Sequence, residues 1–286
     1  MSRQQGKYTN GDTQMSKSVT AIRGCVLAVV GVVLSGLPAL AQAGFTDTIN
    51  MPKGVTPISH HAYNLHMLIL SICAVIGLVV FGAMFYSIVR HRKSVGHEAA
   101  QFHHSTKAEI LWTIIPVFIL VGMAIPATRA VIDIEDASDA DVTIKVTGYQ
   151  WKWRYQYQGT NLDFYSNLAQ SSRDAINRGT NPAEVQHYLL DVDKPMVIPV
   201  NKKVRLLLTA DDVIHAWWVP AFGMKRDAIP GFVNEMWIKA SETGVYRGQC
   251  AELCGAFHGF MPIVVKVKSD ADYKSWLAKQ TAAPGG

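Results

Sequence analysis

The chain is poor in charge and in cysteine. Only 17% of its 286 residues are Asp, Glu, Lys or Arg, against roughly 25% in an average soluble domain. This deficit argues against a disordered chain, a highly charged coiled coil and a simple soluble enzyme. The four cysteines are too few for a disulfide scaffold. Hydrophobic residues, by contrast with charged ones, make up 49% of the chain.

Acidic residues are scarce in the first part of the chain. Residues 1–130 hold 10 Lys and Arg but only 4 Asp and Glu, whereas residues 131–286 hold 17 and 18. The formal net charge of +5 therefore belongs to the first part. Several of these basic residues lie in the loop between two apolar runs, where membrane topology accounts for them. The positive charge is therefore no evidence for nucleic-acid binding. The two parts have to be interpreted separately.

Residues 1–43 have the pattern of a cleaved secretory signal. Lys17 and Arg23 precede an apolar run from Cys25 to Leu40, and Ala41-Gln42-Ala43 offers a small-residue cleavage site. The run is too short for a membrane span of about 20 residues. We therefore predict a signal peptide whose removal takes Cys25 with it.

Residues 44–130 predict a transmembrane hairpin. Residues 65–89 and 110–128 contain no Asp, Glu, Lys or Arg, and both runs can span a bilayer. A basic loop separates them (Arg90-His91-Arg92-Lys93), and acidic residues follow the second. The basic loop should stay in the cytoplasm, which places the exported domain and both ends of the mature chain on the other side.

Residues 131–286 read as an exported β domain. Short runs with period-two alternation, separated by turn residues, are typical of a sandwich or barrel. A short helix is expected within residues 166–185, and a terminal helix after Ser269 or Asp270, to about Gln280. The expected strands are 142–147, 149–157, 187–192, 196–200, 204–209, 213–219, 233–240, 244–249 and 262–267.

Sulfur and imidazole donors cluster near the end of this domain. Cys250, Cys254, His258 and Met261 lie within 12 residues, and His215 stands in Asp211-Asp212-Val-Ile-His215. A Cys250–Cys254 disulfide would leave His258 and Met261 unexplained. Zinc explains two Cys and two His but not a thioether. Copper suits all the donors, and two bridging thiolates could join a pair of copper ions. The spacing alone favours a metal over a disulfide.

The motifs resemble those of subunit II of haem–copper cytochrome c oxidase. The resemblance covers residues 60–270 and rests on the hairpin and on four motifs: Cys-x-Glu-x-Cys-x-x-x-His-x-x-Met, Asp-Val-Ile-His, Gln-Trp-x-Trp and Val-Pro-Ala-Phe-Gly-Met-Lys-Arg-Asp-Ala-Ile-Pro-Gly. It implies an α+β membrane protein, in which a two-helix hairpin precedes a cupredoxin-like sandwich with a dinuclear copper centre, CuA.

The resemblance also implies roles for individual residues. Copper would be held by Cys250, Cys254, His215, His258, Met261 and the carbonyl of Glu252. The Glu252 carboxylate matches a magnesium ligand at the boundary with subunit I, for which an oxygen ligand is apt. Trp151 matches the side chain that receives electrons from cytochrome c. Glu109 matches a carboxylate at the mouth of a proton channel, although the residues alone favour an ordinary helix-start acid.

The resemblance implies partners as well. They are oxidase subunit I, which holds the haems and reduces oxygen with coupled proton pumping, subunit III, cytochrome c and membrane lipid, in a bacterial inner membrane. The docking acids expected after Gln-Trp-x-Trp are missing here, and Asp193, Asp211 and Asp212 remain. Docking of the donor should therefore depend less on charge. A membrane-anchored copper-delivery protein is the competing function, but Met261 and His258 argue against its open site.

Overall fold

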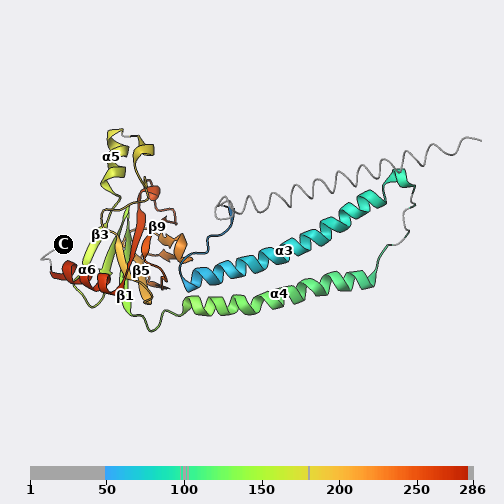
Figure 1. Cartoon of the computed structure of the whole chain (residues 1–286), viewed down its shortest axis with the longest axis horizontal. Helices are drawn as coiled ribbons and strands as arrows, with labels where there is room; N and C mark the ends of the chain where they lie inside the picture. Colours follow the sequence, from blue (N-terminus) through green and yellow to red (C-terminus); the bar gives the residue numbers. More distant parts are fainter. Residues whose placement is uncertain (1–48, 97, 99–100, 102, 180, 283–286) are drawn as a thin grey trace, which may run out of the picture. The chain divides into compact units, whose positions relative to one another are not determined.

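The computed structural model describes residues 49–96, 98, 101, 103–179 and 181–282 (Figure 1). The expected signal peptide, with Cys25, lies outside these residues. The described part holds two long apolar helices, a β sandwich and two shorter helices. An α+β membrane protein with an all-β domain after a helical hairpin is therefore confirmed.

Two helices carry the predicted spans. Helix α3 (Pro57–Arg90) contains residues 65–89, and helix α4 (Thr106–Glu135) contains residues 110–128. Both are longer and more apolar than a membrane crossing needs, and their apolar windows are not buried within the protein. Helices with such surfaces need lipid or partner helices around them.

Helix α3 begins at a buried capping box. The Thr56 hydroxyl accepts a hydrogen bond from the Ser59 backbone, and the Ser59 hydroxyl lies 3.0 Å from the Thr56 nitrogen. The Thr56 hydroxyl also donates to the carbonyl of Phe222 at 2.7 Å. Gly223 next to it has φ +74°, and a Cβ there would lie 2.5 Å from the Ser59 Cα. Only glycine allows this close approach.

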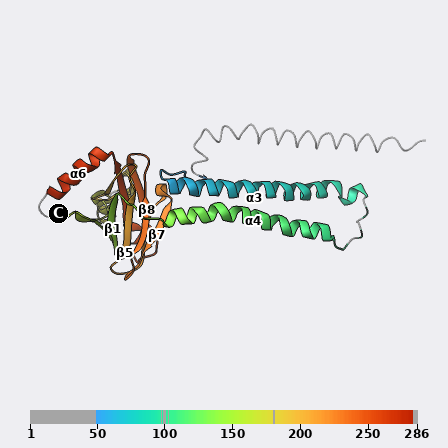
Figure 2. The same ribbon diagram turned by 90° about the horizontal axis from the view of Figure 1, so that it is seen from below.

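Two five-stranded sheets form the sandwich (Figures 1 and 2). One has the order β3-β2-β1-β5-β8 and the other β4-β10-β9-β6-β7. The β1–β5 and β4–β10 pairs are parallel, and the other pairs are antiparallel. The strands are β1 (Val142–Tyr149), β2 (Lys152–Tyr157), β3 (Asp163–Ser166), β4 (Met196–Pro199), β5 (Val204–Ala210), β6 (His215–Val219), β7 (Met224–Ala228), β8 (Asn234–Ile238), β9 (Gly244–Cys250) and β10 (Pro262–Lys268).

Alternating aromatic residues of β2 build one wall of the core. Trp153, Tyr155 and Tyr157 are buried, as the alternation predicts, while the residues between them are half-buried. Trp217 on β6 is fully buried, and its indole nitrogen lies 3.4 Å from the Tyr155 hydroxyl across the sandwich. The aromatic face of β2 thus packs against the second sheet.

Some of the expected strands are wrong. Residues 187–190 form turns in place of a strand, and Val192 makes only an isolated bridge to Leu168. The run 149–157 is broken by a turn at Gln150 and Trp151, so Tyr149 ends β1 and Trp151 leaves the aromatic face. Strands β3 and β7 were missed, because both are short and carry charges. The two expected helices are confirmed as α5 (Gln170–Arg178) and α6 (Asp270–Ala282).

Candidate metal centre

Strand pairing brings three loops to one end of the sandwich. Parallel β1 and β5 end side by side, with Gly148 opposite Ala210. The β1–β2 turn and the loop before β6 therefore start at the same edge. In the other sheet Trp217 pairs with Cys250, which sets the start of β6 beside the end of β9. The turn at Gln150, the loop to His215 and the loop after Cys250 thus meet.

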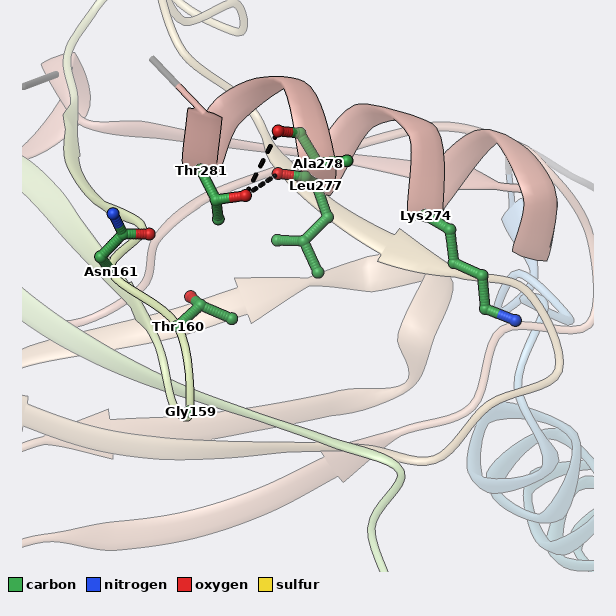
Figure 3. A pocket seen from close by; sticks show the side chains of 7 residues that line it. All are labelled: Gly159, Thr160, Asn161, Lys274, Leu277, Ala278 and Thr281. Atoms are coloured by element: carbon green, nitrogen blue, oxygen red, sulfur yellow. Dashed lines mark hydrogen bonds between the residues drawn. The ribbon is translucent and has the colours of Figure 1, made fainter. Parts of the chain in front are cut away.

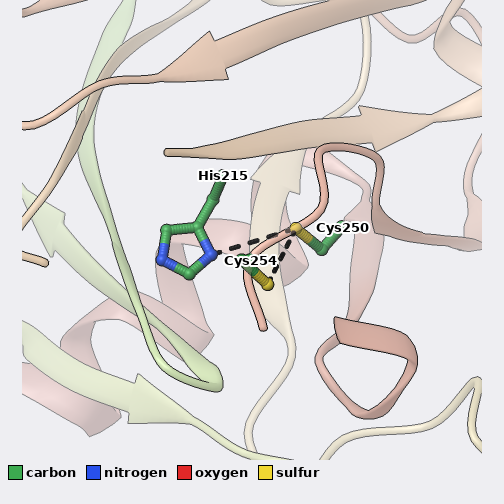
Figure 4. Close-up of side chains that lie close together, drawn as sticks. All are labelled: His215, Cys250 and Cys254. Carbon is green, nitrogen blue, oxygen red and sulfur yellow. Dashed lines mark hydrogen bonds between the residues drawn. The ribbon is translucent and has the colours of Figure 1, made fainter. Parts of the chain in front are cut away.

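The predicted donors converge at this end. Figure 4 shows the His215 ring turned toward the Cys250 and Cys254 thiols. The Cys250 Sγ lies 3.9 Å from His215 Nδ1 and 3.9 Å from the Cys254 Sγ. On the other side, the Cys254 Sγ lies 3.5 Å from His258 Nδ1 and 3.5 Å from the Met261 Sδ. The Glu252 carbonyl lies 3.4 Å from the Cys250 Sγ.

The chemistry of this donor set fits copper. Cys250 and Cys254 are free thiols, and both sulfurs are buried together with His215 and Met261. Two thiols, two imidazoles and a thioether make a soft set, which suits copper better than a hard cation. Each sulfur has its own imidazole, so the arrangement divides into two halves that share the thiols. That division is the one expected for a pair of metal ions.

The two thiols differ in acidity. Burial raises the pKa of the Cys254 thiol to about 12, and the charge on the neighbouring Cys250 adds to this shift. Burial also acts to raise the pKa of Cys250, but hydrogen bonds from His215 and the backbone outweigh it, and that pKa is lowered. One thiol therefore ionises far more readily than the other. A metal that binds both must displace the proton from Cys254.

Asp212 orients the His215 ring. The His215 Nε2 lies 2.9 Å from the Asp212 Oδ1, so the ring donates from Nε2 and presents Nδ1 to the thiols. Burial acts to lower the pKa of His215, but hydrogen bonds with Cys250 and Asp212 outweigh it and raise that pKa. The carboxylate itself accepts from the backbone nitrogens of Gln150 and Val213, at 2.7 and 2.6 Å. Asp212 was expected only at the docking surface, and the Asp-x-x-His spacing was the signal for this contact.

Replacing Asp212 with asparagine should weaken metal binding. The variant disturbs the partner that fixes the His215 tautomer, and loss of such a partner typically costs about 10–100-fold in metal affinity. Copper titration of the purified chain measures this loss. Asp211→Asn is the matched control, because Asp211 is the exposed neighbour, and its copper affinity should match the wild type. Equal affinity in Asp212→Asn and the wild type would contradict the orienting role.

Trp151 lies against the loop that carries the thiols. Its indole nitrogen donates to the Cys254 carbonyl at 3.2 Å, and its ring meets Phe257 edge-on with centroids 4.8 Å apart. Two glycines make room for the rings at this end of the sandwich. A Cβ on Gly148 would lie 2.7 Å from the His215 ring, and one on Gly255, at φ +113°, would lie 3.2 Å from the Trp151 ring. Sequence reasoning missed both glycines.

Asp193, Asp211, Glu109 and the side chain of Glu252 are not part of this donor set. Asp193 accepts from the Asn167 backbone and amide at 2.8 and 3.0 Å, and so fastens the segment that contains α5. Asp211 is exposed, and the Glu252 residue is half-buried. Glu109 lies in the first turn of α4, where its carboxylate accepts from the Ser105 backbone at 3.3 Å. That contact is a helix-capping one.

One open pocket of the sandwich lies away from the sulfur cluster. It measures about 770 Å³ and lies between α6 and the β2–β3 turn, where Lys274, Leu277 and Thr281 face Gly159, Thr160 and Asn161 (Figure 3). Its lining contains no Cys, His, Asp or Glu. The pocket offers no soft metal donor, so the sulfur cluster remains the candidate metal centre.

Both parts of the chain match family models. Residues 45–129 match the transmembrane domain of cytochrome c oxidase subunit II, and residues 142–268 match its periplasmic domain. A probable cytochrome c oxidase subunit 2 of Rickettsia bellii is 39% identical over 256 residues, which cover 89% of this chain and 92% of the relative. The cytochrome c oxidase subunit 2 of Cereibacter sphaeroides is 36% identical over 276 residues, covering 90% and 91%.

A solved structure is similar in sequence over the sandwich. The periplasmic domain of subunit II of cytochrome oxidase from Bradyrhizobium japonicum is 46% identical, covers 51% of this chain and 97% of that one, and has a TM-score of 0.45. The family assignment depends on the two family models and on the near full-length relatives. With two apolar helices, a sandwich and a buried Cys/His cluster, this chain is a membrane protein that belongs to the family of subunit II of cytochrome c oxidase.

Proposed function

We propose that this chain is the electron inlet of a cytochrome c oxidase. It accepts electrons from cytochrome c at a dinuclear CuA centre and delivers them to the haem of subunit I, where oxygen is reduced with coupled proton pumping. One observation carries the proposal: two free thiols, each with its own imidazole, lie 3.9 Å apart, and both cysteines are buried.

Each predicted donor has a part in holding the pair. Cys250 and Cys254 would supply two thiolates to the copper pair, His215 and His258 one imidazole each, and Met261 and the Glu252 carbonyl the remaining donors. A copper pair held by these residues would supply a one-electron acceptor for the reduced donor, with no bond made or broken. The buried setting excludes water from the thiols, and Trp151 links the surface to the Cys254 carbonyl.

The proposal assigns the other residues by family resemblance. The Glu252 carboxylate binds magnesium at the boundary with subunit I, and Glu109 stands at a proton channel. Residues 1–43 are a signal peptide, 44–130 the hairpin and 131–286 the copper domain. The chain lies in a bacterial inner membrane beside subunits I and III, with both mature ends and the copper domain in the periplasm. Alternation of basic and acidic segments supports this orientation.

Metal analysis of the assembled oxidase tests the proposal. The complex, purified through a tag on this chain, should contain two copper ions in this subunit. Electron paramagnetic resonance should show one unpaired electron shared by both. A single copper, or zinc in its place, would refute the electron-inlet function and favour a copper-delivery or structural site.

Docking of the donor should respond weakly to salt. Two of the three expected docking acids, Asp193 and Asp212, are held by hydrogen bonds. Apolar side chains lie exposed on the loop between β9 and β10, called the copper loop below. Leu253 is 78% exposed and Phe257 is 50% exposed. The second-order rate with a lysine-rich cytochrome should therefore fall by less than about tenfold when ionic strength rises from about 0.01 to 0.1 M.

A charge variant sharpens this experiment. The Lys152 ammonium lies 4.5 Å from the Tyr165 ring centroid, one residue from Trp151. Lys152→Glu adds an acid there, so its rate should rise at low salt and fall more steeply as salt is added. A steep fall in the wild type, matching that of Lys152→Glu, would contradict weak electrostatic docking.

A further inference from the structure

The side chain of Gln150 joins two parts of the candidate centre. Its amide donates to the Cys254 carbonyl at 2.9 Å, the same oxygen that accepts from the Trp151 indole at 3.2 Å. One carbonyl of the copper loop is thus held by two neighbouring residues of the β1–β2 turn. Both of its lone pairs are engaged by this turn.

The backbone of Gln150 reaches the other side of the centre. Its nitrogen donates to the Asp212 Oδ2 at 2.7 Å, and Asp212 in turn holds the His215 ring at 2.9 Å. Gln150 therefore contacts the copper loop directly, and it reaches His215 through the Asp212 carboxylate. Gly255 leaves room for this contact, since a Cβ there would lie 3.0 Å from the Gln150 amide nitrogen.

These contacts set where the Trp151 indole lies relative to the copper loop. Trp151 is half-buried at a turn between two strands and packs against the margin of the core, so the core surrounds it less completely than it surrounds Trp153. Its indole has one polar contact with the loop, the Cys254 carbonyl. A second donor on that oxygen holds the carbonyl in place and limits the positions that the indole can take.

We propose that Gln150 is a positioning residue for electron uptake: its amide fixes the Cys254 carbonyl against the Trp151 indole. The inference rests on the proposed function, because it needs a copper pair that accepts electrons through Trp151. Gln150 does not bind metal and is not needed to form the centre. It affects the rate at which electrons reach the centre, because it holds the Trp151 indole in position.

The test replaces Gln150 with methionine in the assembled oxidase. Methionine keeps the length of the side chain but cannot donate, and the backbone bond to Asp212 is retained. Copper content and the resonance signal should equal those of the wild type. Reduction of the copper centre at saturating reduced cytochrome should slow by about fivefold, the factor that one hydrogen bond is worth. The KM for the cytochrome should not change.

Two further variants make the result specific. Gln158→Met is the matched control, because the Gln158 amide also donates to a backbone carbonyl, that of Gln156 at 3.5 Å, at the far end of β2. It should reduce its copper at the wild-type rate. In a Trp151→Phe background, which lacks the indole donor, Gln150→Met should cause no further slowing, because the residue acts through Trp151.

Three outcomes would overturn the proposal. A raised KM with an unchanged saturating rate would make Gln150 a contact of the donor. Loss of copper from Gln150→Met would make it a structural support of the centre. Slowing that adds fully to that of Trp151→Phe would show that it acts independently of the indole. Failure of the proposed function is a separate event, because the wild-type oxidase itself would then lack the copper pair.

Discussion

Replacing Cys254 with serine is expected to abolish the shared-electron signal. A serine hydroxyl is a harder donor and stays protonated, so it cannot bridge two copper ions as a thiolate does. The Cys254 sulfur also contacts both His258 and Met261, so its loss disconnects one half of the donor set. Turnover with cytochrome c should fall by more than about 100-fold, or about 2.7 kcal/mol in the barrier. Copper counting, resonance spectra and oxygen consumption measure these effects.

Cys73→Ser is the matched control for this variant. Cys73 is an exposed thiol of helix α3 and contacts none of the predicted donors. Its copper content and turnover should equal those of the wild type. A Cys254→Ser oxidase that keeps both copper ions and the shared-electron signal would contradict a thiolate-bridged pair.

Replacing Trp151 with leucine is expected to slow electron uptake while the copper centre stays intact. Leucine removes the ring that contacts Phe257 and the indole that reaches the Cys254 carbonyl. It removes no predicted donor. Reduction of the centre by cytochrome c should slow by at least about tenfold, which corresponds to about 1.4 kcal/mol. Rapid mixing with reduced cytochrome, read at the copper centre, measures the rate.

Trp218→Leu separates this effect from a general loss of tryptophan. Trp218 is 40% exposed on β6, within the same sandwich. Its substitution should leave the rate of reduction unchanged. An unchanged rate in Trp151→Leu, or loss of copper from it, would contradict the role of Trp151 as the electron-receiving side chain.

The strongly patterned elements of the fold could be predicted from the sequence. Charge-free runs identified both long helices, and alternation identified the buried face of β2. Strands β3 and β7 could not be found, because their charged residues lie at the edges of the sheets and obscure the alternation. The break at Gln150 was hidden for the opposite reason. The alternating aromatic pattern continues through a turn whose Trp151 packs on a different loop.

The donors of the centre could be predicted, but not what holds them. Residue type and spacing point to Cys250, Cys254, His258 and Met261 without any structure. The contacts of Asp212 with His215 and of Gln150 with Cys254 depend on strand pairing across the sandwich, which no local pattern records. Gly148 likewise becomes meaningful only when β1 is seen to pass the His215 ring.

The pairing of β6 with β9 also sets the stage of folding at which the donors of the centre come together. His215 reaches the copper loop only after β6 and β9 have paired, with Trp217 opposite Cys250. This pairing joins distant parts of the chain. Closures between distant parts of a chain are slow, because the entropy of loop closure opposes them. The sandwich has a large apolar core of its own, so it does not depend on a metal for stability as a zinc finger does. For the proposed copper centre, loading would therefore be a step that follows folding, which the cell could control separately from synthesis of the chain.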